Sequence, residues 1–402
     1  MDLHSGTPFW PARDGIPATY ARLDGDVQCE IAVLGAGITG ALVAHRLVQR
    51  GHDVIVVDAA DVAGGSTAAS SGLLLYETDV SLTALAGRIG TPAATRIYRL
   101  GLEAIDEIES LHDALGTPCG FSRRPALYLA STRRDARRLA IEFELRRRSG
   151  FELDLLSATD IGARYSFSAP AAIRSHGCAE IDAYRFTHAV LATAQRGGAR
   201  VYARTAVTRR REERAGFVLE TAARRRIGAQ FVINAGGYSS AGRRTARSVR
   251  VNSSWAFVSE PVRAFAGWPD RCLIWETARP YFYARTTDDG RVLAGGEDEA
   301  PADGHARSKL MDRKIRRLAA RMQGMFPEIR VHPDFCWAAT FARTADSLPV
   351  IGRSRSSERL IHVLGYGGNG ITFSMIGARS AVRLIEGRRD PDAGLFAVDR
   401  AS

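Results

Sequence analysis

The sequence predicts an α/β protein with two domains, one of them assembled from segments that lie far apart in the chain. Two observations predict this fold class. An apolar run at 31–34 is followed by a glycine turn, a helical pattern and a second apolar run at 54–57. The same order of strand, glycine loop and helix returns near the C-terminus, after a middle part with alternating aromatic residues. Buried strands joined through helices are typical of α/β proteins.

The first glycine turn has the spacing of a dinucleotide-binding motif. Gly35, Gly37 and Gly40 form Gly-x-Gly-x-x-Gly between strand and helix, and Asp58 ends the next strand. We expect Gly35 to allow a tight turn, Gly37 to admit a pyrophosphate and Gly40 to permit close helix–strand packing. The N–H groups at the helix start would face the anion, and Asp58 would accept a hydrogen bond from a ribose hydroxyl. The motif therefore predicts a Rossmann-like domain.

A loop of small residues follows the second strand. Residues 64–72 read Gly-Gly-Ser-Thr-Ala-Ala-Ser-Ser-Gly, and the apolar run Leu73–Leu75 comes next. Such a loop can wrap closely around a flat or phosphorylated ligand. The alternative is a plain helix cap, in which Ser66 or Thr67 starts a helix that runs through Ala69.

The middle of the chain alternates between helical and extended patterns. Apolar residues at 97–111 recur every three or four positions, so 87–151 is expected to be mostly helical. Within it, Arg133–Arg148 predicts a charged helix whose arginines face solvent. The section 152–247 predicts mixed α/β structure, and its strand at 231–234 should end near the first glycine turn.

An aromatic hairpin is the candidate substrate wall. Tyr281, Tyr283 and Arg285 alternate, so one face of a strand would present all three side chains. A turn at 288–290 leads into a return strand at 291–294. The alternative is a half-buried sheet face with a surface arginine.

The C-terminal part repeats the order of strand, glycine loop and helix. Leu360–Leu364 predicts a strand, 365–370 is rich in glycine, and the helix should run from Ile371 to Glu386. The start of this helix could stabilise negative charge that develops on a cofactor ring.

Composition and charge exclude several classes of protein. The net charge of +11 raises the possibility of a polyanion surface, but Lys309 and Lys314 are the only lysines and the arginines are spread along the chain. We interpret the charge as residue usage, so nucleic acid is not an expected partner. Residues 1–27 are polar with three prolines, which predicts an irregular lead-in and no secretory signal. The apolar stretch 31–44 is too short and interrupted to span a bilayer, so a cytoplasmic enzyme is expected.

Cysteine and histidine spacing predicts no metal site. The five cysteines are scattered without a Cys-x-x-Cys pair, which favours reduced and mostly buried thiols. His362 lies inside an apolar run and is expected to be a core histidine with a hydrogen-bond partner.

Taken together, four blocks resemble the D-amino-acid oxidase superfamily of FAD enzymes, which includes glycine oxidase, sarcosine oxidase and gamma-glutamylputrescine oxidase. The blocks are Ile31–Gly40 with Asp58, Gly65–Gly72, Thr344–Gly352 and Gly365–Ile371. The resemblance implies an extended FAD whose flavin ring lies between the two domains.

The resemblance also implies domain limits and cofactor contacts. The FAD-binding domain would comprise 1–86, 152–247 and 336–402, and the substrate domain 87–151 and 248–335. The implied FAD contacts are Gly35, Gly37, Ile38, Thr39, Gly40, Asp58, Ala59, Gly65, Ser66, Ser70, Ser71, Gly72, Val207, Ala235, Gly236, Gly367, Gly368, Asn369, Gly370 and Ile371.

The implied function is oxidation of an amine or amino acid by hydride transfer to flavin, giving an imine that hydrolyses. No catalytic side chain is assigned, because a neutral amine needs no obligatory base. Tyr281, Tyr283 and Trp255 would form an apolar cage. Arg285 or Arg343 would pair a substrate carboxylate, or each could be a structural ion-pair partner.

Two departures from the family concern the flavin and the electron acceptor. Some sarcosine oxidases attach flavin through a cysteine, but the matching position is Ala339, so non-covalent FAD is expected. The return strand Arg291–Gly295 has no lysine to activate oxygen. The acceptor could therefore be oxygen, a quinone or a redox carrier.

Three other hypotheses remain open at this point. The chain could be the flavin-binding subunit of a heteromeric dehydrogenase. It could be an FAD enzyme acting on a modified nucleoside in tRNA, although the methyltransferase domain of that family branch has no room here. A nicotinamide enzyme is weaker, because it would not need the C-terminal glycine block.

Overall fold

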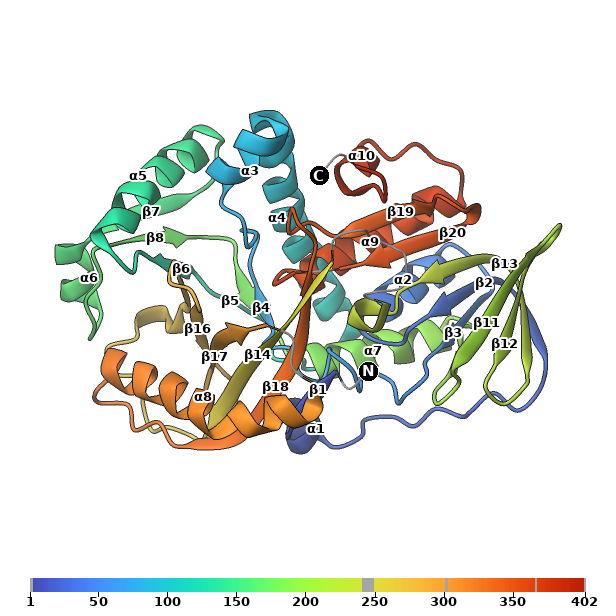
Figure 1. The fold of residues 1–402 in the computed structure, drawn as a ribbon, viewed down its shortest axis with the longest axis horizontal. Coiled ribbons are helices and arrows are strands. Elements are labelled where there is room, and N and C mark those ends of the chain that lie inside the picture. Colours follow the sequence, from blue (N-terminus) through green and yellow to red (C-terminus); the bar gives the residue numbers. More distant parts are fainter. Residues whose placement is uncertain (1–2, 241–248, 301–302, 366, 401–402) are drawn as a thin grey trace.

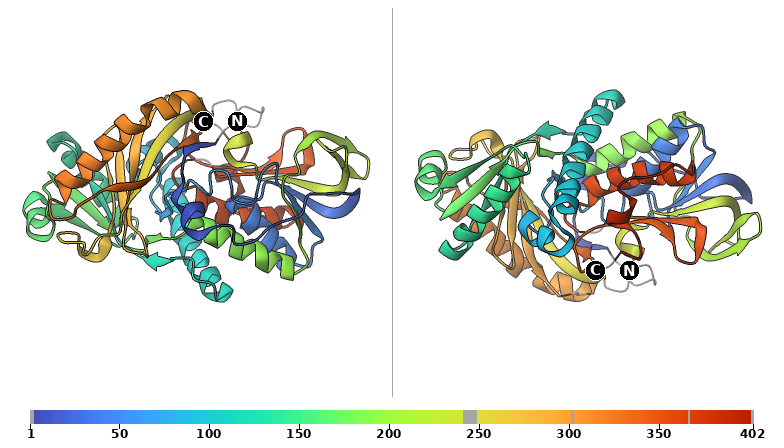
Figure 2. Two further views of the ribbon diagram at one scale, coloured as in Figure 1. Left: turned by 90° about the horizontal axis from the view of Figure 1, so that it is seen from below. Right: turned by 90° about the horizontal axis from the view of Figure 1, so that it is seen from above.

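The computed structural model describes residues 3–240, 249–300, 303–365 and 367–400, and the predicted α/β class is confirmed. Two large sheets form two lobes, and the long helix α4 (Thr91–Leu115) lies between them (Figure 1). The views from below and above in Figure 2 show the same separation.

The first sheet carries the N-terminal glycine turn and has a parallel centre. Its order is β10-β3-β2-β13-β12-β11, with β20 beside β13 and β19 beside β20. Leu34 of β2 lies opposite Val57 of β3 and Asn234 of β13, so three strands end at one edge of the sheet. The strands are β2 (Val27–Leu34), β3 (Val54–Val57), β10 (Arg200–Tyr202), β11 (Val207–Glu213), β12 (Gly216–Thr221), β13 (Arg226–Asn234), β19 (Val350–Ser354) and β20 (Ser357–Leu364).

The two faces of this sheet are covered differently, because side chains alternate along each strand. Ile31 and Val33 belong to the largest core cluster, which includes helices α2 (Ile38–Gln49), α7 (Ala183–Arg196) and α9 (Gly370–Ile385). Ala32 belongs to a separate cluster that includes Phe217 and Leu219 of the β11–β12 hairpin. The apolar run predicted as a buried strand is therefore covered on both faces.

The second sheet has nine strands in the order β1-β18-β14-β17-β16-β15-β6-β8-β7, and α8 (Gly304–Met325) packs on it. The predicted aromatic hairpin is confirmed, since β16 and β17 are antiparallel with Arg285 opposite Leu293. The strands are β1 (His4–Gly6), β6 (Ala126–Leu129), β7 (Leu153–Ser157), β8 (Ala171–Ser175), β14 (Arg250–Ser259), β15 (Leu273–Glu276), β16 (Phe282–Thr286), β17 (Val292–Glu299) and β18 (Pro333–Arg343).

The remaining elements connect the lobes or cover their outer surfaces. A small sheet joins β4 (Leu73–Leu74), β9 (Ala179–Glu180) and β5 (Ser122–Arg123). The other helices are α1 (Phe9–Asp14), α3 (Leu82–Ile89), α5 (Arg133–Arg148), α6 (Ala158–Arg164), α10 (Ala393–Phe396) and the 3-10 turns η1 (Gly237–Ser240) and η2 (Pro269–Arg271).

The sheets divide the chain differently from the expected domain limits. Strands β7 and β8 were expected in the FAD-binding domain, but β8 pairs with β6 in the nine-stranded sheet. Strand β18 stays in that sheet up to Arg343, beside β14. A local pattern predicts a strand but does not identify its distant partner, which explains both differences.

Three local expectations are also corrected. The lead-in is irregular only in part: β1 pairs with β18 and α1 buries Phe9 and Trp10, whereas residues 15–26 form no helix or strand. Residues 61–69 form turns instead of a capped helix, because the Thr67 hydroxyl accepts the Ile38 N–H across the glycine turn. Arg146 is fully buried between Glu77 and Glu142, so the charged helix α5 does not turn all its arginines to solvent.

The expectations for the thiols and for His362 are confirmed. All five cysteines are free thiols, and all except Cys336 are buried. His362 is buried with Nδ1 3.3 Å from Nδ2 of Asn234, and burial lowers the pKa of this histidine to about 4. Within the part of the chain that the structure describes, no cluster of three His, Cys, Asp or Glu side chains suits a metal ion. None of the described helices is long and apolar enough to cross a membrane.

Candidate active site

A cavity of about 660 Å³ runs from the first glycine turn to the aromatic hairpin. Both large sheets contribute to its wall: Gly35 and Asp58 follow strands of the first sheet, and Trp255 and Tyr283 lie on the second. The structure thus brings together both glycine loops, the loop at 64–72 and the aromatic hairpin, although more than 200 residues separate the glycine turn from the hairpin. The fourth block of the sequence resemblance, Thr344–Gly352, does not line the cavity.

The glycines of the first turn have two separate functions. Gly35 has a φ of +114°, and a Cβ there would lie 2.5 Å from the carbonyl oxygen of Ala235. A Cβ on Gly40 would lie 1.8 Å from the carbonyl oxygen of Gly35. Gly40 does not line the cavity, so it permits helix α2 to pack on the turn instead of contacting a ligand itself.

Asp58 closes the far end of the turn. Its carboxylate accepts the N–H groups of Ala36 at 2.7 Å and Ala60 at 2.9 Å. Burial raises the pKa of Asp58, and these two hydrogen bonds oppose that rise. Asp58, Ala59 and Val207 line the cavity here, which is where the adenosine end of FAD was expected.

Three buried donors hold successive carbonyl oxygens of the small-residue loop (residues 64–72). Trp337 donates to Ala69 at 3.0 Å, Trp10 to Ser70 at 2.6 Å and Arg285 to Ser71 at 2.6 Å. The donors come from β18, α1 and β16. The loop thus acquires a fixed shape from distant parts of the chain, although its residues have little packing surface of their own.

The same loop presents an unpartnered hydroxyl to the cavity. Oγ of Ser66 is buried, lines the cavity and has no hydrogen-bond partner. Across from it, Ile38 and Thr39 begin helix α2, whose first N–H groups are not all used by the helix. A buried hydroxyl beside a helix start fits the phosphates of FAD.

The C-terminal glycine loop (residues 365–370) lies against the segment that follows the small-residue loop. The Asn369 side chain donates to the carbonyl oxygens of Leu75 and Glu77, both at 2.8 Å. The Gly368 N–H donates to the Asp79 carboxylate at 3.1 Å. Tyr366 lies outside the described residues.

The beginnings of two helices meet at this loop. Thr39 of α2 and Ser374 of α9 share a hydrogen bond of 2.7 Å between their hydroxyls. Both residues line the cavity. The positive ends of both helix dipoles are therefore directed to one cavity, which suits an anionic or electron-rich ligand.

The other predicted FAD contacts line this cavity as well. All of them except Gly40, which lies behind the turn, are part of the cavity wall. They are Gly35, Gly37, Ile38, Thr39, Asp58, Ala59, Gly65, Ser66, Ser70, Ser71, Gly72, Val207, Ala235, Gly236, Gly367, Gly368, Asn369, Gly370 and Ile371.

Neither predicted carboxylate-binding arginine lines the cavity. Arg285 is 2% exposed, and its guanidinium bonds to Ser71, Ile181 and Thr286 and lies 3.4 Å from the Glu180 carboxylate. Its structural alternative is therefore the one that the contacts favour. Arg343 is half-buried at the end of β18, outside the lining.

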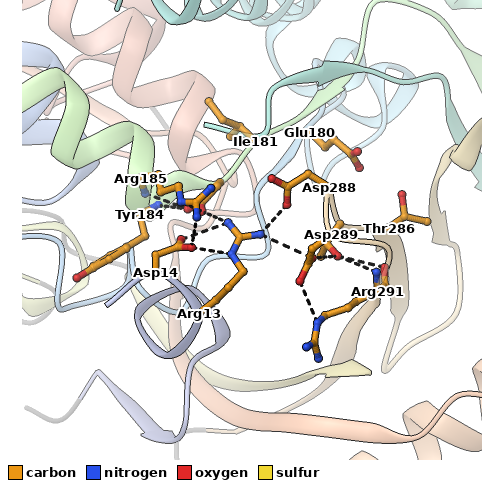
Figure 3. Close-up of polar contacts among 12 residues, drawn as sticks. Arg13, Asp14, Glu180, Ile181, Tyr184, Arg185, Thr286, Asp288, Asp289 and Arg291 are labelled. Carbon is orange, nitrogen blue, oxygen red and sulfur yellow. Dashed lines mark hydrogen bonds and ion pairs between the residues drawn. The ribbon is translucent and has the colours of Figure 1, made fainter. Parts of the chain in front are cut away.

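The neighbourhood of Arg285 contains a second ion network, shown in Figure 3. Arg13 of α1 pairs with Asp14, with the buried Asp182 at the start of α7 and with Asp288 in the turn after β16. The network joins the N-terminal helix to both lobes. It supports the wall of the cavity from behind and does not open into it.

Aromatic side chains form the other end of the cavity, which we call the aromatic end: Trp275, Tyr281 and Tyr283. The expected cage member Trp255 contributes no ring to it, because its side chain is buried on the other face of the sheet, under α8, where Nε1 donates to the Arg307 carbonyl oxygen. Gly295 makes room for Tyr283, because a Cβ there would lie 2.3 Å from the tyrosine oxygen. The Trp275 ring stacks on Tyr128 at 3.7 Å between centroids.

Sequence reasoning missed three residues at this end. Asp79 and Trp275 line the cavity, and the exposed Arg279 lies over the Tyr281 ring at 5.1 Å. Arg279 and Trp275 flank the predicted hairpin, so proximity to it could have found them. Asp79 has no signal of its own, since its position depends on the distant Gly368.

Known proteins match this chain over most of its length. The chain is 23% identical to the gamma-glutamylputrescine oxidoreductase of Escherichia coli (strain K12), covering 96% of this chain and 90% of that protein. It is 24% identical to the glycine oxidase of Geobacillus kaustophilus (strain HTA426), covering 89% and 93%. The crystal structure of glycine oxidase from Geobacillus kaustophilus matches with a TM-score of 0.77 and 21% identity, over 93% of this chain and 99% of that one.

A family model described as FAD dependent oxidoreductase, DAO, matches residues 30–384. That span includes both glycine loops, the small-residue loop and the aromatic hairpin. The chain therefore belongs to the DAO family of FAD-dependent oxidoreductases.

Proposed function

We propose that this oxidoreductase oxidises an amine or an amino acid at the carbon that bears the nitrogen. The observation that carries the proposal is the single cavity, which joins a dinucleotide-type glycine turn to an aromatic end. The names of two relatives, gamma-glutamylputrescine oxidoreductase and glycine oxidase, support an amine or amino-acid substrate.

We propose that FAD lies along this cavity. The turn at Gly35–Thr39 would hold the pyrophosphate, with Ser66 adding a hydroxyl donor. Asp58 and Val207 would hold the adenosine, and the C-terminal glycine loop would border the flavin. When bound, FAD supplies the two-electron chemistry, accepting a hydride from the carbon beside the nitrogen and leaving an imine that water hydrolyses.

The protein's own contribution is orientation and exclusion of water. Trp275, Tyr281 and Tyr283 give the substrate end apolar walls, and burial raises the pKa of Tyr283 to about 12, so this hydroxyl stays protonated at neutral pH. A substrate amine that arrives neutral needs no side-chain base.

The experiment that tests the function follows the product. The purified FAD-loaded protein is incubated with amines and amino acids and an artificial electron acceptor. Oxidation beside the nitrogen should give a carbonyl compound together with an equal amount of ammonia or released amine. A flavin-loaded chain that forms no carbonyl product from any of them would favour the alternative, a flavin-binding subunit of a heteromeric dehydrogenase.

We also propose that FAD is held without a covalent bond. Ala339 lines the cavity at the position where a flavin-attaching cysteine would stand, whereas Cys336 does not line it. Acid precipitation should release the flavin into the supernatant. Flavin that stays with the precipitated chain would contradict this.

The acceptor is proposed to be a quinone or redox carrier in preference to oxygen. Neither lysine lines the cavity. Lys314 is buried behind Trp255, 5.0 Å from its ring, and pairs with Glu297 and Glu299. Reduced flavin should therefore reoxidise slowly in air, and rapid reoxidation would contradict the proposal.

A further inference from the structure

We propose that the aromatic end recognises a second positive charge, so that the substrate is an amine that also carries an ammonium or guanidinium group. This inference rests on the proposed amine oxidation and names the substrate class of the same site. Its basis is a pair of carboxyl groups, Asp79 and Asp298, that form no ion pair within the part of the chain that the structure describes.

Asp79 is the carboxyl group that faces the cavity. It is half-buried and lines the wall between the C-terminal glycine loop and the aromatic end. One oxygen accepts the Gly368 N–H at 3.1 Å, and a Cβ on Gly368 would lie 2.6 Å from the other. The carboxyl group is therefore fixed in position by the backbone, beside the expected flavin.

Asp298 lies near the same wall, where burial raises its pKa and a hydrogen bond with the Ser254 side chain opposes that rise. It is close enough to Tyr281 and Tyr283 to affect their ionisation, and both tyrosines line the cavity. Its Oδ1 is buried and has no hydrogen-bond partner. Burial raises the pKa of both acids, that of Asp298 to about 6. The charged form of a buried carboxyl group is unfavourable when no cation lies beside it.

Among the residues that the structure describes, Asp79 and Asp298 lack the arginine partner that several other acids inside the fold have. Other buried acids have arginine partners: Glu142 with Arg146, Asp182 with Arg13 and Glu276 with Arg321. Over the described ranges, neither Asp79 nor Asp298 forms an ion pair, although the chain has 55 lysines and arginines. Arg279 and Arg343 lower the pKa of both acids from a greater distance.

The aromatic walls supply a second, independent indication of a ligand. Trp275 is 9% exposed and lines the cavity, and its Nε1 is buried without a hydrogen-bond partner. Its N–H is open to an oxygen of a bound molecule. Trp275, Tyr281 and Tyr283 also offer ring faces, and a cation between aromatic rings and a carboxylate is stabilised by both.

The test compares matched ligands that differ by one positive charge. The FAD-loaded full chain is titrated anaerobically with 1,4-diaminobutane and butylamine, and with lysine and norleucine of both hands. Binding is followed by calorimetry and by the change in the flavin spectrum. In at least one pair, the ligand with the additional amino group (1,4-diaminobutane or lysine) should bind about tenfold more tightly at pH 8 than its partner. This difference is expected for one charge-assisted contact.

The Asp79→Asn variant identifies the group responsible. Asparagine keeps an oxygen for the Gly368 N–H, so the loop should stay folded. In Asp79→Asn, the tenfold preference for the ligand with the additional charge should fall to about threefold or less. The Asp79→Glu variant, which keeps a carboxylate, should retain more of this preference than Asp79→Asn. Asp113→Asn is the matched control, since that side chain is 71% exposed on α4, and it should keep the full preference.

The outcomes separate this inference from the proposed function. If amines reduce the flavin but no pair shows a preference, or the preference survives in Asp79→Asn, the second-charge site is wrong and amine oxidation stands. If no amine binds or reduces the flavin, the proposed function fails, and this inference fails with it.

Discussion

Gly40 shows at the scale of one residue that a member of a ligand-binding motif can serve packing, as its spacing predicted, without lining the cavity itself. The spacing predicted a ligand-binding turn, and the turn lines the cavity. Gly40 itself contacts the turn from behind, since a Cβ there would lie 1.8 Å from the Gly35 carbonyl oxygen. The same motif that signals the ligand thus includes a residue whose task is packing.

Gly40→Ala should abolish FAD binding. The added methyl group would overlap backbone atoms, so the turn would have to shift. The free energy of unfolding should therefore fall by at least about 3 kcal/mol. FAD content and urea unfolding measure the two effects. Gly25→Ala is the control, because nothing lies within 4 Å of its Cβ, and it should leave both unchanged. Normal FAD content in Gly40→Ala would contradict the packing role.

Asp298 gives a pH dependence with a definite sign. Burial raises its pKa from 3.8 to about 6, so the folded state favours the protonated form. The contribution of Asp298 to the free energy of unfolding is fully present below about pH 4 and is lost as the pH rises through about 6. Asp298→Asn, which cannot ionise, should be more stable than the parent at pH 8 by about 1–3 kcal/mol, with no gain at pH 4. Urea unfolding without substrate measures this, and a less stable variant at pH 8 would contradict it.

Arg285 shows where residue-level prediction stops. Alternation correctly placed Tyr281, Tyr283 and Arg285 on one face of a strand. What lies opposite that face comes from elsewhere in the chain: the Ser71 carbonyl oxygen and the Glu180 carboxylate. The sequence pattern of a strand does not show which distant residues its side chains contact. It therefore could not decide whether Arg285 binds a ligand or has a structural role.

At the scale of elements, the N-terminal helix α1 is an unexpected support of the site. Trp10 holds the Ser70 carbonyl oxygen, and Arg13 connects α1 to α7 and to the turn after β16 (Figure 3). The sequence of 1–27 suggested an irregular lead-in because its prolines interrupt any long pattern. A helix of six residues is too short to show the period that predicts longer ones.

Arg13→Ala should destabilise the protein strongly. It would leave Asp182, whose side chain is 1% exposed, without its closest cation. Removing one partner of a buried ion pair costs about 3–5 kcal/mol, so thermal unfolding should shift downward clearly. Arg211→Ala is the control, because Arg211 and Glu213 are 76% and 45% exposed, and it should change the free energy of unfolding by less than about 1 kcal/mol. Equal effects of the two variants would contradict the role of the network.

At the scale of the whole molecule, the sequence predicted most elements but not how they divide between the two sheets. The strands at 54–57, 231–234 and 360–364 lie in the parallel sheet, where their apolar runs suggested burial on both faces. The strands at 153–157 and 171–175 have equally ordinary patterns and pair in the other sheet. Pairing is decided by contacts across the whole chain, which no local window contains.

The cavity is likewise a property of the whole molecule. Its dinucleotide end was predictable because glycine spacing reflects the backbone's own limits. Its aromatic end was predictable only in part, because Asp79 reaches it through a hydrogen bond to Gly368 on the last glycine loop. The position of the Asp79 carboxyl group at the substrate end could therefore be seen only in the folded structure.

The measurement that tests the central claim most directly is the visible spectrum of the purified chain during anaerobic addition of amines and amino acids. We expect a flavin band at ~450 nm that at least one of these compounds bleaches, with a carbonyl product formed in equal amount. A chain without the band, or a band that none of the amines or amino acids bleaches, would contradict it.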